Sequence, residues 1–280
     1  MNVWQADFYY LPSQPGTVKL WELVICECFD STQEKIKYKV YSVQCESNQA
    51  NAQWLAAQIK QIAGDKLPDK IQVFRPQTLS LLTTAAETLG IVVEATRNTS
   101  ILKEVLVQRD REKYPDYNPI KLERPVPQPL PGDLWGDRWQ IANINAGQIV
   151  DLFIDLPIPI CHLPSALFPI NLGIASNVPI PGIVVYGGRK SMQIATWIEQ
   201  QNPAYINYIP TEIGKSGGFI LETGLVDRWI FNTFESESAA EIARSYEQKK
   251  KAAKGLHFIL IQPDDSGMTN TAFWLLQEDC

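Results

Sequence analysis

Glu22 is a carboxylate inside one of the most apolar stretches of the chain, where it needs either a partner or a chemical role. The run Lys19–Glu27 is rich in Val, Ile and Trp, is bounded by turn-forming residues and is short for a helix. It therefore predicts a buried strand. Alternate residues of a strand share a face, so Glu22 is expected beside Val24, Cys26 and Cys28.

Acidic residues on neighbouring strands could bind the metal of a nuclease. Three expected strands, a helix and a further strand are typical of the restriction-endonuclease-like topology, whose metal site takes an acid and then an acid-x-Lys. Glu22 or Glu27 could supply the first ligand, but the next strand, through Ser42 and Glu46, lacks the second. Mg²⁺ then has no site to activate water. The sequence therefore predicts this topology in the N-terminal domain without a metal or catalysis, and a metal-dependent nuclease is the least favoured function.

Two other motifs that resemble catalytic sites are weak. Gly214-Lys215-Ser216 resembles a phosphate-binding loop, but the glycine required five residues earlier is Ile209. Cys161 and His162 resemble a thiol nucleophile and its base, yet catalytic partners normally meet through the fold rather than as sequence neighbours. Three further cysteines could line one sheet face as soft metal ligands, although they lack a Cys-x-x-Cys spacing: Cys26, Cys28 and Cys45.

Nucleic-acid binding has to be local, because the chain carries a formal net charge of −6. Eight Trp and ten Tyr offer rings on which unpaired bases could stack beside a basic track. A solvated surface of mixed charge is the simpler interpretation of the same composition. The candidate RNA-binding cations are Lys35, Lys37, Lys39, Arg75, Arg97, Arg189 and Lys190.

The order of expected elements predicts an α/β protein of two domains with mixed sheets. Residues 1–110 form the first domain, residues 111–134 a proline-rich extended linker, and residues 135–280 the second domain. A strand, a polar turn, a helix carrying Trp54 or Trp197, and a short strand occur once in each half. This similarity suggests an internal duplication.

Several local patterns also predict individual elements. Ser47 or Asn48 is expected to cap a helix that runs to about residue 63. Gln148–Asp155 is expected to be a strand. A helix is expected to carry the apolar residues Met192, Ala195, Trp197 and Ile198, and Ser238 opens a capping box at the start of the last helix.

The apolar runs, the first residues and the cysteine count indicate the compartment in which the protein acts. No run of about 18 apolar residues exists, so no membrane span is predicted. The first residues lack the basic start and apolar centre of a signal peptide. Five cysteines without framework spacing are typical of a reducing compartment. We expect a cytoplasmic protein without a cofactor.

Three segments together resemble a known family. They are the run around Trp21 and Glu22, the start with Trp4 and Asp7, and the terminal Trp274-Leu275-Leu276. The chain is similar over its full length to the RNA-binding translation-activator family of cyanobacteria and chloroplasts, the TAB/ATAB type.

The resemblance implies a non-catalytic factor that binds the single-stranded leader of a photosystem messenger, and no DNA. It also implies that Trp274, Leu275 and Leu276 matter for function, although an apolar strand would equally be part of a core. With no transit peptide, the chain resembles a cyanobacterial member. The alternative is a protein-interaction factor for photosystem assembly that does not contact RNA.

Overall fold

A computed structural model describes residues 2–12, 19–29, 37–114, 117–132 and 134–278, with only the backbone of residues 29, 37 and 110–113. The chain divides into two compact units, Met1–Glu123 (unit 1) and Arg124–Cys280 (unit 2). Both units are mixed α/β, as the sequence predicts. None of the described helices is long and apolar enough to cross a lipid bilayer.

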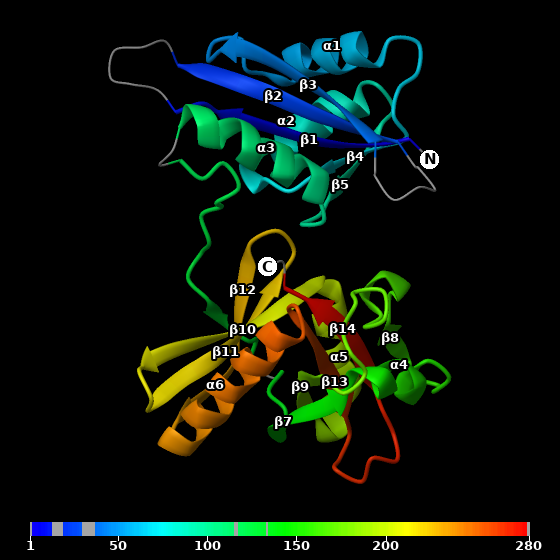
Figure 1. Ribbon diagram of the computed structural model, residues 1–280, viewed down its shortest axis with the longest axis vertical. Coiled ribbons are helices and arrows are strands. Elements are labelled where there is room, and N and C mark those ends of the chain that lie inside the picture. The colour runs from blue at the N-terminus through cyan, green and yellow to red at the C-terminus, as the bar shows by residue number, and fades with distance from the viewer. Residues whose placement is uncertain (1, 13–18, 30–36, 115–116, 133, 279–280) are drawn as a thin grey trace. The chain divides into compact units, whose positions relative to one another are not determined.

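Unit 1 is built on one five-stranded sheet with the strand order β3-β2-β1-β4-β5 (Figure 1). The pairs β1–β2 and β2–β3 are antiparallel, whereas β1, β4 and β5 are parallel. Each strand alternates between the two faces, so Ala6 and Phe8 face one core while Asp7 and Tyr9 face the opposite side. The strands are β1 Val3–Tyr10, β2 Leu20–Phe29, β3 Lys37–Glu46, β4 Lys70–Val73 and β5 Val92–Ala95.

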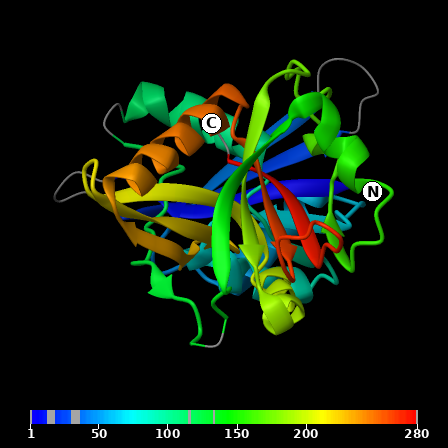
Figure 2. The ribbon, with the colours of Figure 1, turned by 90° about the horizontal axis from the view of Figure 1, so that it is seen from below.

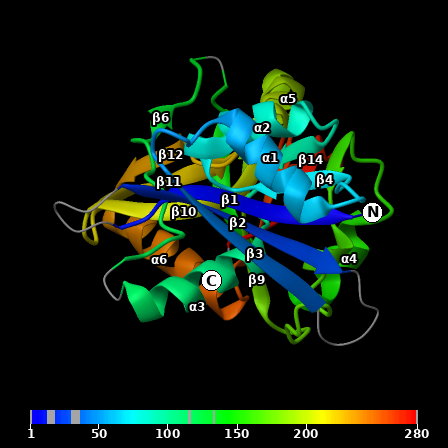
Figure 3. The same ribbon diagram turned by 90° about the horizontal axis from the view of Figure 1, so that it is seen from above.

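Helices cover both faces of this sheet. α1 (Ala52–Ala63) and α2 (Pro76–Glu87) lie on one face, as the view from above shows (Figure 3). α3 (Ser100–Lys113) packs on the opposite face through Leu102 and Leu106.

Helix α1 begins later than expected. Its N-cap is Asn51, whose side chain accepts a hydrogen bond from the Trp54 amide at 2.9 Å, and not Ser47 or Asn48. Ser and Asn are both good caps, so sequence alone does not choose between neighbouring candidates.

The restriction-endonuclease-like topology is not confirmed. The succession of three strands, a helix and a further strand is present, but β4 pairs with β1 and not with β3. The prediction used the order of elements along the chain, which does not determine the neighbours of a strand after a helical crossover.

Unit 2 contains two sheets. One has the order β10-β11-β12-β6, and the other has the order β7-β9-β13-β14-β8. The strands are β6 Gln128–Pro129, β7 Arg138–Asn145, β8 Ile160–His162, β9 Pro179–Tyr186, β10 Pro203–Glu212, β11 Ser216–Thr223, β12 Asp227–Glu235, β13 Leu256–Gln262 and β14 Ala272–Gln277.

The largest core of unit 2 joins both sheets to two helices. Ile206 and Phe219 of the four-stranded sheet belong to the same buried cluster as Ile183, Ile259 and Trp274 of the five-stranded sheet. α6 lies along the β10–β12 strands (Figure 2). The helices are α4 Ala146–Phe153, α5 Ser191–Gln200 and α6 Glu237–Ala252, with single turns η1 Ser165–Leu167 and η2 Gly188–Lys190.

The expected strand Gln148–Asp155 is wrong, because residues 148–153 belong to helix α4. Ile149 and Phe153 are buried one turn apart, and a short run of apolar residues does not distinguish a strand from a helix. The N-cap of α6 is Ser236, whose hydroxyl accepts from the Ala239 amide, and not Ser238.

The suggested duplication is not reproduced. The strands on either side of the Trp54 helix, β3 and β4, belong to one sheet, whereas β9 and β10 on either side of the Trp197 helix belong to different sheets. The two similar stretches of sequence therefore have different surroundings.

The proline-rich segment packs at both of its ends. Tyr117, Ile120 and Leu122 contact the core beneath α3 in unit 1. Leu130 and Leu134 are buried in the core of unit 2, and β6 pairs with β12. The division between the units falls after Glu123, within the segment expected to link the two domains.

Candidate functional site

The role of Glu22 is structural. Its carboxylate is 3% exposed, forms an ion pair with Arg109 of α3, and accepts hydrogen bonds from the Tyr9, Ser42 and Gln44 side chains at 3.0, 2.6 and 3.3 Å. Burial acts to raise the pKa of Glu22, but the Ser42 hydrogen bond, the Arg109 charge and the remaining donors outweigh it and lower the pKa. Glu22 therefore stays charged and anchors α3 to the sheet.

Asp7 forms a second buried ion pair on the same sheet face. Arg75 donates from Nε to Oδ1 and from Nη2 to Oδ2, each at 2.8 Å, and its Nη2 also donates to the Pro119 carbonyl at 2.6 Å. Asp7 is fully buried, and the Arg75 side chain is 12% exposed. Burial acts to lower the pKa of Arg75, but the bonds and charge of Asp7 raise it.

This ion pair occupies the position where an open α/β sheet usually binds its ligand. Such ligands bind beyond the carboxyl ends of parallel strands, at the point where the strand order reverses. In this sheet, β1 continues past the end of β4 and carries Asp7 there, while Arg75 follows β4 directly. The two side chains neutralise each other at this edge, so Arg75 is engaged within the fold.

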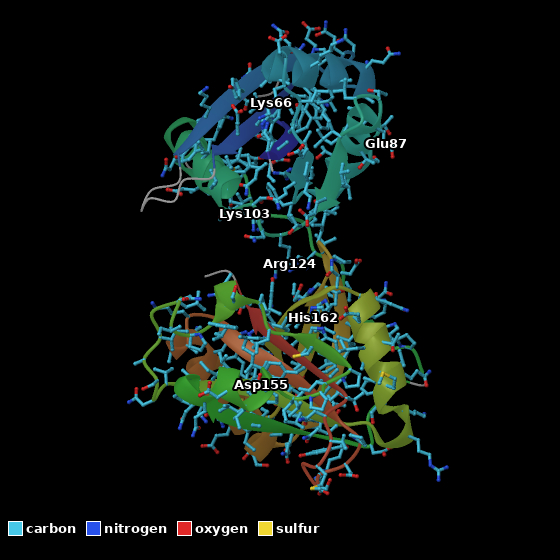
Figure 4. All side chains as sticks on the ribbon, turned by 90° about the vertical axis from the view of Figure 1, so that its right-hand side faces the viewer. Lys66, Glu87, Lys103, Arg124, Asp155 and His162 are labelled. Atoms are coloured by element: carbon cyan, nitrogen blue, oxygen red, sulfur yellow. The ribbon has the colours of Figure 1, made fainter. Side chains whose placement is uncertain are left out.

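The other predicted cations of unit 1 do not gather. Lys39 is exposed on β3, and Arg97 is partly buried just after β5, at the opposite edge of the sheet. The Arg97 carbonyl accepts from Lys103, which Figure 4 labels, at 2.6 Å. Lys35 lies outside the described residues, and only the backbone of Lys37 is described.

The cysteines do not line one face. Cys26 belongs to the core beneath α3, whereas Cys45 belongs to the core under α1 and α2, so this expectation is wrong. Burial, with a smaller effect of Cys28, raises the pKa of Cys26 to about 12. The described residues include no group of three His, Cys, Asp or Glu side chains that could hold a metal ion.

Cys161 and His162 do not behave as a nucleophile with its base. Burial raises the pKa of the Cys161 thiol. His162 Nε2, labelled in Figure 4, lies 2.7 Å from a carboxylate oxygen of Glu199, and its ring is parallel to that of Trp274. The histidine therefore connects β8 to α5.

The exposed face of α5 presents cations, amides and an aromatic ring. Lys190, Gln193, Trp197 and Gln200 follow one another at spacings of three or four residues, which places them along one side of the helix. Arg189 and Lys190 are exposed in the turn before the helix. Neither forms an ion pair with any residue that the structure describes.

A cleft of about 470 Å³ runs along this face, within the range of small-molecule sites. One wall is α5, with Met192, Gln193, Thr196, Trp197 and Gln200. The other wall is the segment on both sides of residue 133, which we call the strap and define as Leu130–Gly132 with Leu134–Gly136; Pro131, Gly132 and Leu134 line the cleft.

Trp197 is held in place without being covered. It is half-buried, and its ring meets Trp229 edge-on at 5.1 Å. The Trp229 indole in turn donates to the Thr223 hydroxyl at 3.1 Å. An oriented and partly exposed indole, on a helix that two exposed cations precede, is a surface on which an unpaired base can stack.

The sequence placed several of these residues wrongly or missed them. Of the apolar residues expected in α5, Ala195 and Ile198 are buried, whereas Met192 is 46% exposed and lines the cleft. The buried apolar stripe consists of Ile194, Ala195 and Ile198. Reading the helix from that stripe would have placed three unassigned polar residues on its outer face: Gln193, Thr196 and Gln200.

The apolar residues of the family motif pack in or against the cores. Trp4 and Trp274 are 1% and 2% exposed, and Leu275 and Leu276 are buried with Trp274 in β14. Trp21 stacks on Phe8. The Trp274 indole also donates to Glu199 of α5 at 3.2 Å, so the terminal motif helps to position the helix that carries the cleft.

Two mixed α/β domains, one of them with a cleft, a partly exposed indole and two exposed cations that form no described ion pair, define a protein suited to holding an anionic polymer. Family comparison agrees with this class. Residues 3–109 match the family model described as "RNA-binding protein Tab2/Atab2 N terminal", and residues 117–277 match the model of the C-terminal domain. The chain belongs to the Tab2/Atab2 family of RNA-binding proteins.

Two curated relatives support this membership. The chain is 28% identical over 284 residues to "Protein TAB2 homolog, chloroplastic" of Arabidopsis thaliana, covering 98% of this chain and 74% of that protein. It is 26% identical over 284 residues to the protein of the same name from Zea mays, with 98% and 70% covered. Both relatives are therefore longer than the region they share with this chain.

Proposed function

We propose that this protein is a non-catalytic RNA-binding factor that supports translation of photosystem reaction-centre proteins. The ligand would be a single-stranded messenger leader, held in the α5 cleft of unit 2. Membership of an RNA-binding family and the chloroplast relatives support this role. The observation that carries it is the exposed face of α5, where Arg189 and Lys190 lead into a cleft with Trp197 as a wall.

The cleft and the two cations that precede α5 each have a task in this proposal. Arg189 and Lys190 contact phosphates, because they are exposed cations without a described acidic partner. Trp197 stacks on an unpaired base, and the amides of Gln193 and Gln200 contact base edges. Lys39 and Arg97 stay candidates for contacts elsewhere on the RNA, as do Lys35 and Lys37.

The absence of catalysis is part of the proposal. The buried carboxylates Asp7 and Glu22 are each engaged with an arginine, which leaves them unsuited to hold a divalent metal. A cytoplasmic location and a cyanobacterial origin also stay predictions.

A role in protein assembly without RNA is the second candidate. The end of α4 and the residues after it expose three large apolar side chains, with Leu152, Ile154 and Leu156 at 48%, 52% and 45% exposure. Exposed apolar residues that are close together in the chain favour a protein partner.

Filter binding of the full chain to a photosystem I core messenger leader tests the proposal, with coding-region RNA of equal length as the reference. Two phosphate contacts predict about a sevenfold loss of affinity from 50 to 200 mM KCl, because the slope is about −0.7 per contact on single strands. Trp197→Ala is expected to weaken binding by about 1–3 kcal/mol, the worth of one stacked base. No retention of RNA at 50 mM KCl would favour the assembly role instead.

A further inference from the structure

Leu134 of the strap separates the cleft from a second, smaller cavity of about 40 Å³. Its apolar floor comes from β9, β12 and α5, and Trp135, Arg138 and Trp139 line it from the strap and β7. Trp135 is 41% exposed, and Trp139 is partly buried. The Arg138 guanidinium lies over the Tyr186 ring and pairs with Asp265, so it is held at the edge of the cavity.

Asn232 of β12 is the polar residue of this cavity that lacks a partner. The residue is 8% exposed, and its amide nitrogen Nδ2 is buried without a hydrogen bond to any described atom. A buried donor in that state destabilises the fold, and an acceptor that enters the cavity beside it would satisfy it.

A β-bulge directs Asn232 into the cavity. In the pairing of β11 with β12, Phe219 faces Asn232 and Ile220 faces Ile230, so Phe231 is an additional residue. Consecutive strand residues normally point to opposite faces, yet Phe231 and Asn232 both line this cavity. Bulges commonly redirect side chains at functional sites.

The size of the cavity limits what can occupy it. A volume of about 40 Å³ exceeds the roughly 10–15 Å³ that one water needs, and it is far below the usual size of a pocket for a whole small molecule. It accommodates the edge of a flat ring, such as a carbonyl oxygen or a ring nitrogen. The rest of such a ring would then lie against the exposed Trp135.

We propose that this cavity takes the acceptor edge of an unpaired nucleobase, with Asn232 Nδ2 as the donor. The inference deepens the proposed function and rests on it, because it assigns one base of the bound RNA to a second site across Leu134 from the cleft. Asn232 would discriminate among bases, whereas Arg189 and Lys190 would hold phosphates irrespective of sequence.

Asn232→Leu in the full chain tests this assignment. The change removes the donor while keeping a similar shape, and Asn143→Leu at an exposed position of β7 is the matched control. Affinity for a twelve-residue oligouridylate is expected to fall about tenfold, and affinity for an abasic ribose-phosphate oligomer of the same length to stay unchanged. Urea denaturation is expected to show Asn232→Leu at least as stable as the wild type.

Equal affinity of the wild type and Asn232→Leu for homopolymers of all four bases would overturn the inference, and the cavity would then hold only water. A loss of affinity that is the same for the abasic oligomer would also overturn it, because it would indicate a general structural effect.

A second measurement separates this inference from the proposed function. In the ¹⁵N-labelled full chain, the side-chain amide signals of Asn232 are identified by their absence from Asn232→Leu. Free uridine is expected to shift these signals. If the wild type retains no RNA while uridine shifts these signals, the proposed function fails and the base site stands. If RNA binds but neither uridine nor the substitution has an effect, the base site fails and the proposed function stands.

Discussion

The two units use their cations in opposite ways. In unit 1, Arg75 and Arg109 are drawn into the sheet, where each neutralises a buried carboxylate and connects segments distant in the chain. In unit 2, Arg189 and Lys190 remain exposed at the start of α5, without a described acidic partner. A count of basic residues does not distinguish these two uses, whereas the presence or absence of an ion pair with a carboxylate does.

The indoles divide in the same manner. Trp4 and Trp274 fill cores and are almost completely buried, while Trp135 and Trp197 line cavities of unit 2. The aromatic content therefore stabilises both units, but only part of it is available to a ligand.

Removing the carboxylate from a buried pair of unit 1 should have the largest effect. Asp7→Ala leaves the Arg75 guanidinium buried without its counter-charge, which is expected to cost about 3–5 kcal/mol of unfolding free energy. Urea denaturation followed by circular dichroism measures it. The double variant Asp7→Leu with Arg75→Met is expected to be more stable than Asp7→Ala alone. An unchanged denaturation midpoint for Asp7→Ala would show that the pair does not support the fold.

Unit 2 should lose stability in acid, because its fold keeps the buried His257 side chain neutral. His257 is fully buried and accepts from the Ile206 amide at 2.9 Å; burial, with the Lys250 charge, lowers its pKa from 6.5 to about 3. Because the unfolded chain binds the proton more readily, the contribution of His257 is complete above pH 6.5 and is lost progressively down to pH 3. The expected loss is on the order of 4 kcal/mol.

Thermal or urea unfolding between pH 7 and pH 4 measures this dependence. The variant His257→Gln should be less stable at pH 7 and should show a shallower loss below pH 6.5. A pH dependence that is the same in the variant and the wild type would indicate that other groups cause it.

Substitutions at the start of α5 are expected to change stability least and to change RNA binding clearly. Arg189→Ala with Lys190→Ala should lower the slope of log affinity against log salt by about 1.4, which corresponds to two phosphate contacts on a single strand. The unfolding free energy should change by less than about 0.5 kcal/mol, because both side chains are exposed. Lys60→Ala with Lys66→Ala, at two exposed lysines of unit 1 that are not candidate RNA contacts, is the matched control. If it reduces the slope as much, the contrast between the units fails.

The sequence was sufficient for features that depend on neighbours along the chain. The alternation in Lys19–Glu27 placed Glu22 with Val24 and Cys26, as the structure confirms. It did not identify Arg109 as the partner, because the two are brought together by the packing of α3. Strand order was beyond the same reasoning, since pairing of β4 with β1 depends on a crossover. Asn232 carried no local signal, because the bulge that redirects it is defined by the partner strand.

The hydrogen bond from Arg75 to the Pro119 carbonyl has a practical consequence for dissecting this protein. A fragment cut at residue 110, the domain end expected from the sequence, would lack this acceptor and the apolar contacts of Tyr117, Ile120 and Leu122. The guanidinium would then be open to solvent on that side, and part of the apolar surface beneath α3 would be exposed. An isolated first half should therefore extend through Glu123, so that a weakened fragment is not mistaken for an intrinsically unstable domain.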